Sequence, residues 1–113
     1  MANASGAPVP LSISSEHPAL PGHFPGSPVV PGVVILDLII QTLLERYPAQ
    51  RIQGIRKIKF LRPLAPDEVF LLQSGEPQGD SLRFKCHLQD SGQLLAEGNL
   101  VLGVVAQHEP PVA

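Results

Sequence analysis

The sequence predicts an α+β fold in which a curled antiparallel sheet wraps around one long helix. Residues 33–47, VVILDLIIQTLLERY, form the only long helical pattern, and they are apolar on nearly every side. The four strand-like segments that follow alternate between apolar and polar residues, most cleanly over residues 82–88. We therefore expect a helix that is buried all round by a meander of antiparallel strands.

The expected elements are separated by clear breaks. Residues 9–13 read as a short edge strand that tolerates Pro10, and Pro48 ends the helix. Further strands are expected at residues 55–61, 69–73, 82–88 and 93–104. Asp90-Ser91-Gly92 predicts a three-residue hairpin loop with glycine at positive φ. A single curved sheet leaves open edges, so we expect a homodimer that closes them.

Length and composition predict one globular domain over residues 9–105, with flexible tails at residues 1–8 and 106–113. The net charge of −2 argues against nucleic acid as the main partner. The single cysteine, Cys86, excludes an intramolecular disulfide and is typical of a reducing compartment. The first ten residues lack the cationic and apolar regions of a signal peptide, and no apolar run approaches the ~20 residues of a membrane span. We expect a cytoplasmic protein without a membrane span.

A stiff loop precedes the helix. Prolines at positions 18, 21, 25, 28 and 31 fix φ, and glycines at 22, 26 and 32 permit turns. Such a loop loses little entropy on folding, so it can hold His23 in a fixed place. Within the helix, Asp37 and Gln41 are spaced i to i+4 and therefore lie on one face. His23 and Asp37 are the residues we expect to carry chemistry.

The segment GHFPGSPVVPGVVILDLIIQ resembles the signature of the β-hydroxyacyl-acyl-carrier-protein dehydratases of fatty-acid synthesis. The resemblance continues more weakly through KIKFLRPLAPDEVFLL and LLAEGNL and covers about Leu11 to Gly103. It implies the hot-dog fold, in which a long helix lies in a curled antiparallel sheet. Asp37 matches the branch that also isomerises its product, whereas the compact chain is more similar to small dehydratases of polyene or pigment clusters.

Dehydration of a 3-hydroxyacyl thioester removes a proton from C2 and hydroxide from C3. His23 suits the base because imidazole titrates near neutral pH. Asp37 suits the acid, because a carboxyl on an apolar helix is poorly solvated and favours its neutral form. Gln41 could orient that carboxyl, and the Gly32 N–H at the positive helix start could bind the thioester oxygen. The resemblance implies the same roles, with His23 and Asp37 of one site coming from different subunits.

The reaction needs no cofactor or metal, and the partner that the resemblance implies is an acyl carrier protein. Because carrier proteins are acidic, a basic patch near the tunnel mouth would attract them, although a merely solvated strand face explains the same charges. The cations of this patch are Arg56, Lys57, Lys59, Arg62, Arg83 and Lys85, and the first four are the residues expected to contact the carrier. The substrate tunnel is expected to run along the helix, with Phe24, Pro25, Val30, Pro31 and Val33 lining it.

Other readings of the same residues stay open. Asp37 could be a helix-dipole partner, Gln41 an ordinary buried amide, and Cys86 a core residue. His17 and His23 lack further ligands at a spacing suited to a metal. The alternative functions are a hot-dog acyl thioesterase and a non-catalytic hot-dog subunit that binds acyl carrier protein.

Overall fold

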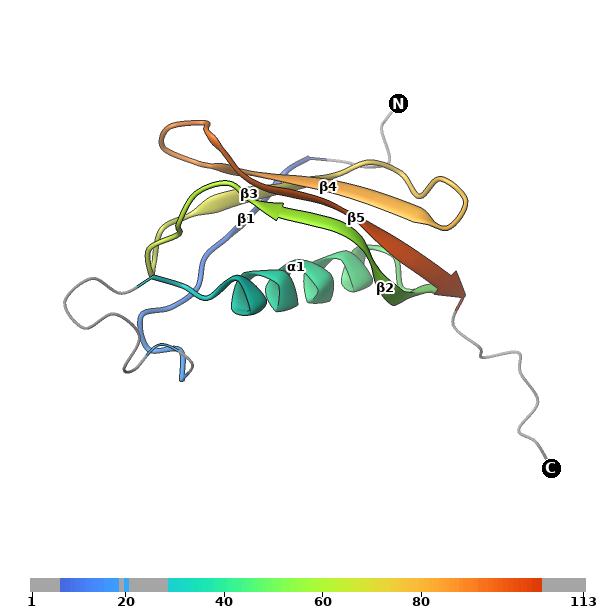
Figure 1. The fold of residues 1–113 in the computed structure, drawn as a ribbon, viewed down its shortest axis with the longest axis horizontal. Helices are drawn as coiled ribbons and strands as arrows, with labels where there is room; N and C mark the ends of the chain where they lie inside the picture. The colour runs from blue at the N-terminus through green and yellow to red at the C-terminus, as the bar shows by residue number, and fades with distance from the viewer. Residues whose placement is uncertain (1–6, 19, 21–28, 105–113) are drawn as a thin grey trace.

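A computed structural model describes residues 7–18, 20 and 29–104 of this chain. Most of the two predicted tails, residues 1–6 and 105–113, lies outside the described residues. The described residues form one helix and five strands, and Figure 1 shows the helix lying along one face of the sheet. In chain order the elements are β1 (Val9–Leu11), α1 (Gly32–Arg46), β2 (Gln50–Phe60), β3 (Phe70–Ser74), β4 (Ser81–Leu88) and β5 (Leu94–Val104).

The strands form one antiparallel sheet in the order β1-β3-β4-β5-β2. The predicted meander is correct for β3, β4 and β5 but wrong for β2, which pairs with β5 instead of β3. The connection after β2 contains Pro63 and Pro66, and it spans residues 61–69 instead of forming a tight hairpin. Strand β2 also begins at Gln50, five residues before the predicted start. The predicted hairpin between β4 and β5 is confirmed, with Gly92 at φ 75°, but residues 89–93 connect the two strands instead of the predicted three residues.

The core lies between α1 and the inner face of the sheet. Ile35, Ile39 and Leu43 recur every fourth residue on α1 and are buried. The inner face of the sheet contributes large apolar side chains, each worth about 1.5–3 kcal/mol when buried. These buried residues include Phe70, Leu72, Leu82, Phe84, Cys86, Leu95 and Leu100. As predicted, Cys86 is a core residue.

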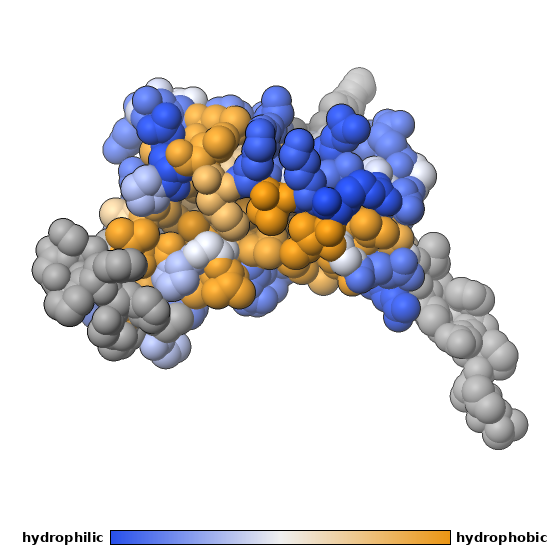
Figure 2. Space-filling model, in the orientation of Figure 1, coloured by the Kyte–Doolittle hydropathy of each residue, from blue (hydrophilic) through white to orange (hydrophobic). Residues whose placement is uncertain are grey.

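The opposite face of α1 is open to solvent in the single chain. Val33, Asp37 and Gln41 are exposed, and Val33 retains 72% of its accessible surface. The expectation that the helix is buried all round is therefore wrong for one chain, because one sheet covers only one side of a helix. Figure 2 shows a hydrophobic band below the hydrophilic outer surface of the sheet.

The two edges of the sheet differ. The β1 edge is three residues long and contains Pro10, whereas the β2 edge is eleven residues long. Two register shifts interrupt the pairing of β2 with β5, between Ile52 and Gly54 and between Ile55 and Lys57. The longer edge also carries an exposed apolar side chain, Ile55. Within the part of the chain that the structure describes, no helix is long and apolar enough to cross a membrane.

Candidate active site

The start of α1 carries the Gly32 amide, for which the described residues provide no acceptor. Pro31 is the N-cap, and its carbonyl oxygen accepts hydrogen bonds from the amides of Val34 and Ile35 at 3.0 and 3.3 Å. The amide of Val30 donates to the Leu64 carbonyl at 2.9 Å, which anchors the chain just before the helix. No side chain caps this end, and within the described residues the Gly32 amide donates to no acceptor. An amide at the positive end of a helix can stabilise an oxygen that gains negative charge.

Phe60 packs directly against this helix start. A Cβ atom added to Gly32 would lie 3.0 Å from the Phe60 ring, so the close packing of the ring depends on glycine. A hollow of about 390 Å³ lies beside the two residues. It is lined by Val30, Gly32, Ile35, Phe60, Leu61, Arg62, Pro63 and Leu64. Sequence reasoning missed Phe60, although its position on the inward-facing side of a predicted strand was a signal that it could reach the helix.

Asp37 and Gln41 form the hydrogen bond that their spacing predicts. The Gln41 Nε2 donates to the Asp37 Oδ2 at 2.9 Å. Asp37 is the sixth residue of α1 and so lies beyond the first turn, where a dipole partner would be placed. Both side chains are exposed, so the expectation of a poorly solvated Asp37 is wrong for the single chain, and the alternative of Gln41 as a buried amide does not hold there.

The Gly32 amide and the Asp37 carboxyl face different sides of the helix. Gly32 and Ile35 line the hollow, whereas Asp37 lies on the exposed face. Two residues correspond to a rotation of about 200° around an α-helix, so Ile35 and Asp37 point in nearly opposite directions. A molecule in the hollow is therefore screened by the helix from the Asp37 of the same chain.

The remaining predicted catalytic and tunnel residues differ in where they lie. His23, Phe24 and Pro25 lie outside the described residues. Of the other predicted tunnel residues, Val30 is buried and lines the hollow beside Gly32. Pro31 and Val33 do not line it, and Val33 points into solvent. Val33 therefore belongs to the exposed face that carries Asp37.

The four cations predicted to bind the carrier protein do not lie together on one surface. Lys57 and Lys59 lie on the outer face of the sheet, opposite Asn99 and Glu97 of β5. Arg56 instead forms an ion pair with Asp80 at 3.2 Å. Arg62 lies at the other end of β2, where its Nε donates to the Leu94 carbonyl at 3.2 Å. Only two of the four predicted cations therefore face outward from the sheet.

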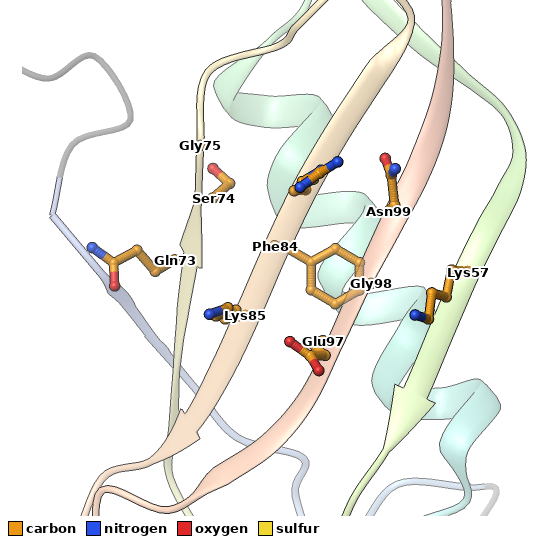
Figure 3. A pocket seen from close by; sticks show the side chains of 10 residues that line it. Lys57, Gln73, Ser74, Gly75, Phe84, Lys85, Glu97, Gly98 and Asn99 are labelled. Atoms are coloured by element: carbon orange, nitrogen blue, oxygen red, sulfur yellow. The ribbon is translucent and has the colours of Figure 1, made fainter.

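Two further cations of the predicted basic patch, Arg83 and Lys85, lie on the same outer face as Lys57 and Lys59. In the strand register, Arg83 lies across Asn99 from Lys57, and Lys85 lies across Glu97 from Lys59. Figure 3 shows Lys57, Lys85, Glu97 and Asn99 around a hollow of about 670 Å³, with the helix behind the sheet. Among the described residues none of these four cations forms an ion pair. This larger hollow lies on the face away from the helix and so cannot hold a molecule that contacts Gly32.

The solved structures identify the fold. The chain superimposes on the dehydratase heterocomplex ApeI:P from Xenorhabdus doucetiae with a TM-score of 0.72 and 25% identity, covering 84% of each chain. It also matches a 1,4-dihydroxy-2-naphthoyl-CoA thioesterase from Synechocystis with a TM-score of 0.51 and 12% identity, covering 87% of this chain and 82% of that one. The curled five-stranded sheet on a single helix is thus the hot-dog fold.

The sequence identifies the family. Residues 2–99 match the family described as ApeI dehydratase. The 3-hydroxyacyl-[acyl-carrier-protein] dehydratase FabZ of Chlamydia trachomatis serovar L2 is 32% identical over 109 residues, covering 86% of this chain and 71% of that protein. The FabZ of Ehrlichia chaffeensis is 27% identical over 107 residues, covering 87% of this chain and 73% of that protein. The chain belongs to the ApeI-like dehydratase family.

Proposed function

We propose that this protein is a dehydratase that converts 3-hydroxyacyl thioesters on an acyl carrier protein into trans-2-enoyl thioesters. The observation that carries the proposal is the Asp37 carboxyl, held by Gln41 at 2.9 Å on the helix that begins with the open Gly32 amide. The match to the dehydratase family supports the reaction, and these two groups are proposed as its acid and its oxyanion donor.

These side chains account for every proton that is transferred in the reaction, and no other group is needed. The base, His23, takes the C2 proton while the thioester oxygen gains charge against the Gly32 amide. The electron pair forms the C2–C3 double bond and breaks the C3–O bond. Asp37 protonates the departing hydroxide, so water leaves, and a proton passes from His23 back to Asp37 before the next turnover. Gln41 is a positioning residue that holds the carboxyl.

A second copy of this chain would complete the site. The Asp37 of one chain faces away from the hollow at its own Gly32, so the acid that serves this hollow must come from another chain. The exposed Val33 beside Asp37 and the long β2 edge with Ile55 are the apolar surfaces that such a copy would cover. Coverage would also remove Asp37 from water, which favours the protonated carboxyl that an acid needs. The active unit is thus a homodimer with shared sites.

The carrier protein is proposed to dock on the outward-facing cations. Lys57, Lys59, Arg83 and Lys85 have no anionic partner among the described residues, whereas carrier proteins are acidic. Arg56 and Arg62 have a smaller role here because Asp80 and the Leu94 carbonyl hold them. Raising the salt concentration should therefore lower kcat/KM for a carrier-bound substrate more than for a small thioester.

The acyl chain itself is proposed to be a specialised, polyene- or pigment-type chain, in a cytoplasmic pathway. The match to the ApeI-like family supports this assignment. An assay across 3-hydroxyacyl thioesters that differ in length and unsaturation tests it. A strict preference for saturated chains of ordinary fatty acids would contradict the assignment while leaving the dehydratase chemistry intact.

The deciding experiment is an assay of the purified protein with a 3-hydroxyacyl thioester, monitoring the enoyl absorbance and free thiol. Enoyl product supports the dehydratase. Release of free thiol without enoyl product indicates a thioesterase, and neither product indicates a non-catalytic subunit.

The two proposed catalytic residues are tested together. The variants His23→Ala and Asp37→Asn should each abolish turnover while circular dichroism and size-exclusion chromatography show a folded dimer. Mixing the two inactive variants should restore part of the activity, because exchange of subunits creates one site with both intact residues. Absence of any recovery, under conditions where subunit exchange is demonstrated, would contradict the shared site.

A further inference from the structure

Asp67 has a backbone conformation that few residues adopt. Its φ of 68° lies in the left-handed region, and among the described residues it is the one non-glycine residue with a positive φ. Aspartate tolerates this region better than most residues, because its short carboxyl can hydrogen-bond to nearby backbone, but the conformation still has a steric cost. Such a conformation persists only where surrounding contacts hold it. The contacts of Asp67 therefore compensate for this cost.

The hydrogen bonds of Asp67 lead to a part of the chain that is distant in sequence. Its amide donates to the Ile13 carbonyl at 2.7 Å, and its Oδ1 accepts a hydrogen bond from the Ser15 amide at 3.2 Å. These contacts lie just beyond the pairing of β1 with β3, which ends where Leu11 pairs with Phe70. One backbone and one side-chain contact thus join residues 13–15 to the connection between β2 and β3.

The Asp67 carboxylate is not needed to close that connection itself. The Glu68 amide donates to the Ala65 carbonyl at 3.2 Å, and the Ala65 amide donates to the Glu68 Oε1 at 3.0 Å. The Asp67 side chain takes no part in this turn, and among the described residues its hydrogen-bond partner is the Ser15 amide. A role within the connection therefore does not explain the carboxylate.

The contact with Ser15 fixes the start of the segment that leads to His23. Beyond Ser15, two backbone hydrogen bonds of 3.0 Å follow in succession, the first between residues 14 and 17 and the second between residues 17 and 20. The side chain of Leu20 is buried in the core. The chain is thus held from the Ser15 contact to Leu20, which is three positions before His23 in the sequence.

The far end of the segment is held by the same connection. Where the structure describes the chain again, the Val30 amide donates to the Leu64 carbonyl at 2.9 Å, and both residues are buried. Leu64 lies three positions before Asp67. The connection between β2 and β3 therefore holds the chain on both sides of residues 16–29. Fixing both ends of a segment reduces the number of conformations open to the residues between them.

We infer that Asp67 is a positioning residue for the catalytic base, acting through Ser15 on the segment that carries His23. This role rests on the proposed function, in which His23 removes the C2 proton. A base must lie within hydrogen-bond reach of that proton, and a displacement of about 1 Å can lower the rate by about 100-fold. The contact at Leu64 is made by buried backbone, so the exposed Asp67 carboxylate is the contact that a side-chain substitution removes.

Asp67→Gly removes the carboxylate and keeps the backbone conformation. Glycine adopts positive φ without steric cost, which offsets the loss of an exposed hydrogen bond, so the urea midpoint of unfolding should stay close to the wild-type value. The kcat for a 3-hydroxyacyl thioester should fall by about 10-fold or more with KM little changed, because the base is displaced and the substrate contacts remain. Asp67→Asn should restore kcat, since asparagine keeps an acceptor oxygen and tolerates positive φ.

Glu68→Gln is the matched control. It removes a carboxylate charge from the adjacent residue, whose Oε1 bonds the Ala65 amide within the same connection, and it should leave kcat unchanged. Equal kcat in Asp67→Gly and wild type would overturn the positioning role. An Asp67→Asn protein as slow as Asp67→Gly would also overturn it, because the charge and not the contact with Ser15 would then be responsible.

Hydrogen exchange followed by mass spectrometry tests the contact without turnover. The amides of residues 13–20 should exchange faster in Asp67→Gly than in wild type, whereas those of α1 should not change. Unchanged exchange over residues 13–20 would overturn the positioning role even if kcat fell, because Asp67 would then not be what holds this segment.

The two measurements separate the positioning role from the proposed function. A wild-type protein that forms no enoyl product would refute the dehydratase, and faster exchange in Asp67→Gly alone would still support Asp67 as the residue that holds the segment. A wild-type protein that forms enoyl product, with Asp67→Gly equal to it in kcat and in exchange, would refute the positioning role and retain the dehydratase.

Discussion

Gln41 donates a hydrogen bond of 2.9 Å to the carboxyl of Asp37 across one turn of the helix. Removing the donor in Gln41→Leu should lower kcat by about 10-fold, because a hydrogen bond to a carboxyl contributes roughly 1–1.5 kcal/mol to its positioning. The pH dependence of kcat should shift as well, since the bond acts on the acid and not on the fold. The measurement is the pH–rate profile of the variant against wild type.

The matched control is Glu45→Gln, which changes the next exposed residue along the same face of α1. It should leave the pH–rate profile unchanged. Equal profiles for Gln41→Leu and wild type would show that the hydrogen bond has no part in catalysis.

Gly32 and Phe60 should be energetically coupled. In Gly32→Ala the new methyl group lies 3.0 Å from the ring, so the ring must move, and we expect a loss of stability of roughly 1 kcal/mol. In the Phe60→Leu background the same substitution should cost much less, because the smaller side chain leaves room. A double-mutant cycle measured by urea unfolding gives the coupling, and additive effects would contradict the packing described here.

Gly98 should tolerate a side chain even less well than Gly32. A Cβ atom there would lie 2.7 Å from the Phe84 ring and 2.8 Å from the carbonyl oxygen of Lys57. Because the second contact is backbone, relief requires movement of β2, and Gly98→Ala should cost about 1–3 kcal/mol in urea unfolding. Gly54→Ala is the control on the neighbouring strand, since its Cβ meets nothing within 4 Å. Similar stabilities of the two variants would refute this account.

The local pattern of the sequence was sufficient to predict the helix and the strands, but not which elements lie next to each other. Residues 82–88 alternate because one face of β4 is buried, and this signal is local. The pairing of β2 with β5 depends on the path of residues 61–69, which no periodicity records. The apolar helix was correctly placed, but its composition does not distinguish burial by the same chain from burial by a second one. Val33 illustrates this ambiguity, since it is apolar and yet 72% exposed.

The candidate site was predictable where spacing along one element decides the geometry. The hydrogen bond between Asp37 and Gln41 follows from their i, i+4 spacing. The contact between Gly32 and Phe60 joins residues 28 positions apart and depends on how the sheet packs on the helix start, so no local rule predicts it. Lys57 lies near Arg83, and both lie apart from Arg56. This arrangement likewise follows only from the strand register.

Cys86 gives the chain a dependence of stability on alkaline pH. Burial raises the pKa of the Cys86 thiol from 9.0 to about 12, because the thiolate would lose its hydration in the core. Between these two values the unfolded chain has lost a proton that the folded chain retains, so unfolding releases a proton and stability falls as the pH rises. The loss should approach about 1.4 kcal/mol per pH unit over this window and should be absent below pH 9.0.

The comparison with Cys86→Ala isolates this contribution, because the two proteins differ only at this side chain. The variant should be less stable near neutral pH, since it leaves a small cavity in the core. The stability difference between wild type and variant should, however, shrink between about pH 8 and about pH 10.5, as the wild type alone loses the contribution of its thiol. Urea unfolding at the two pH values measures the difference. A constant difference would mean that the thiol is hydrated in the folded protein, which would contradict its placement between the sheet and α1.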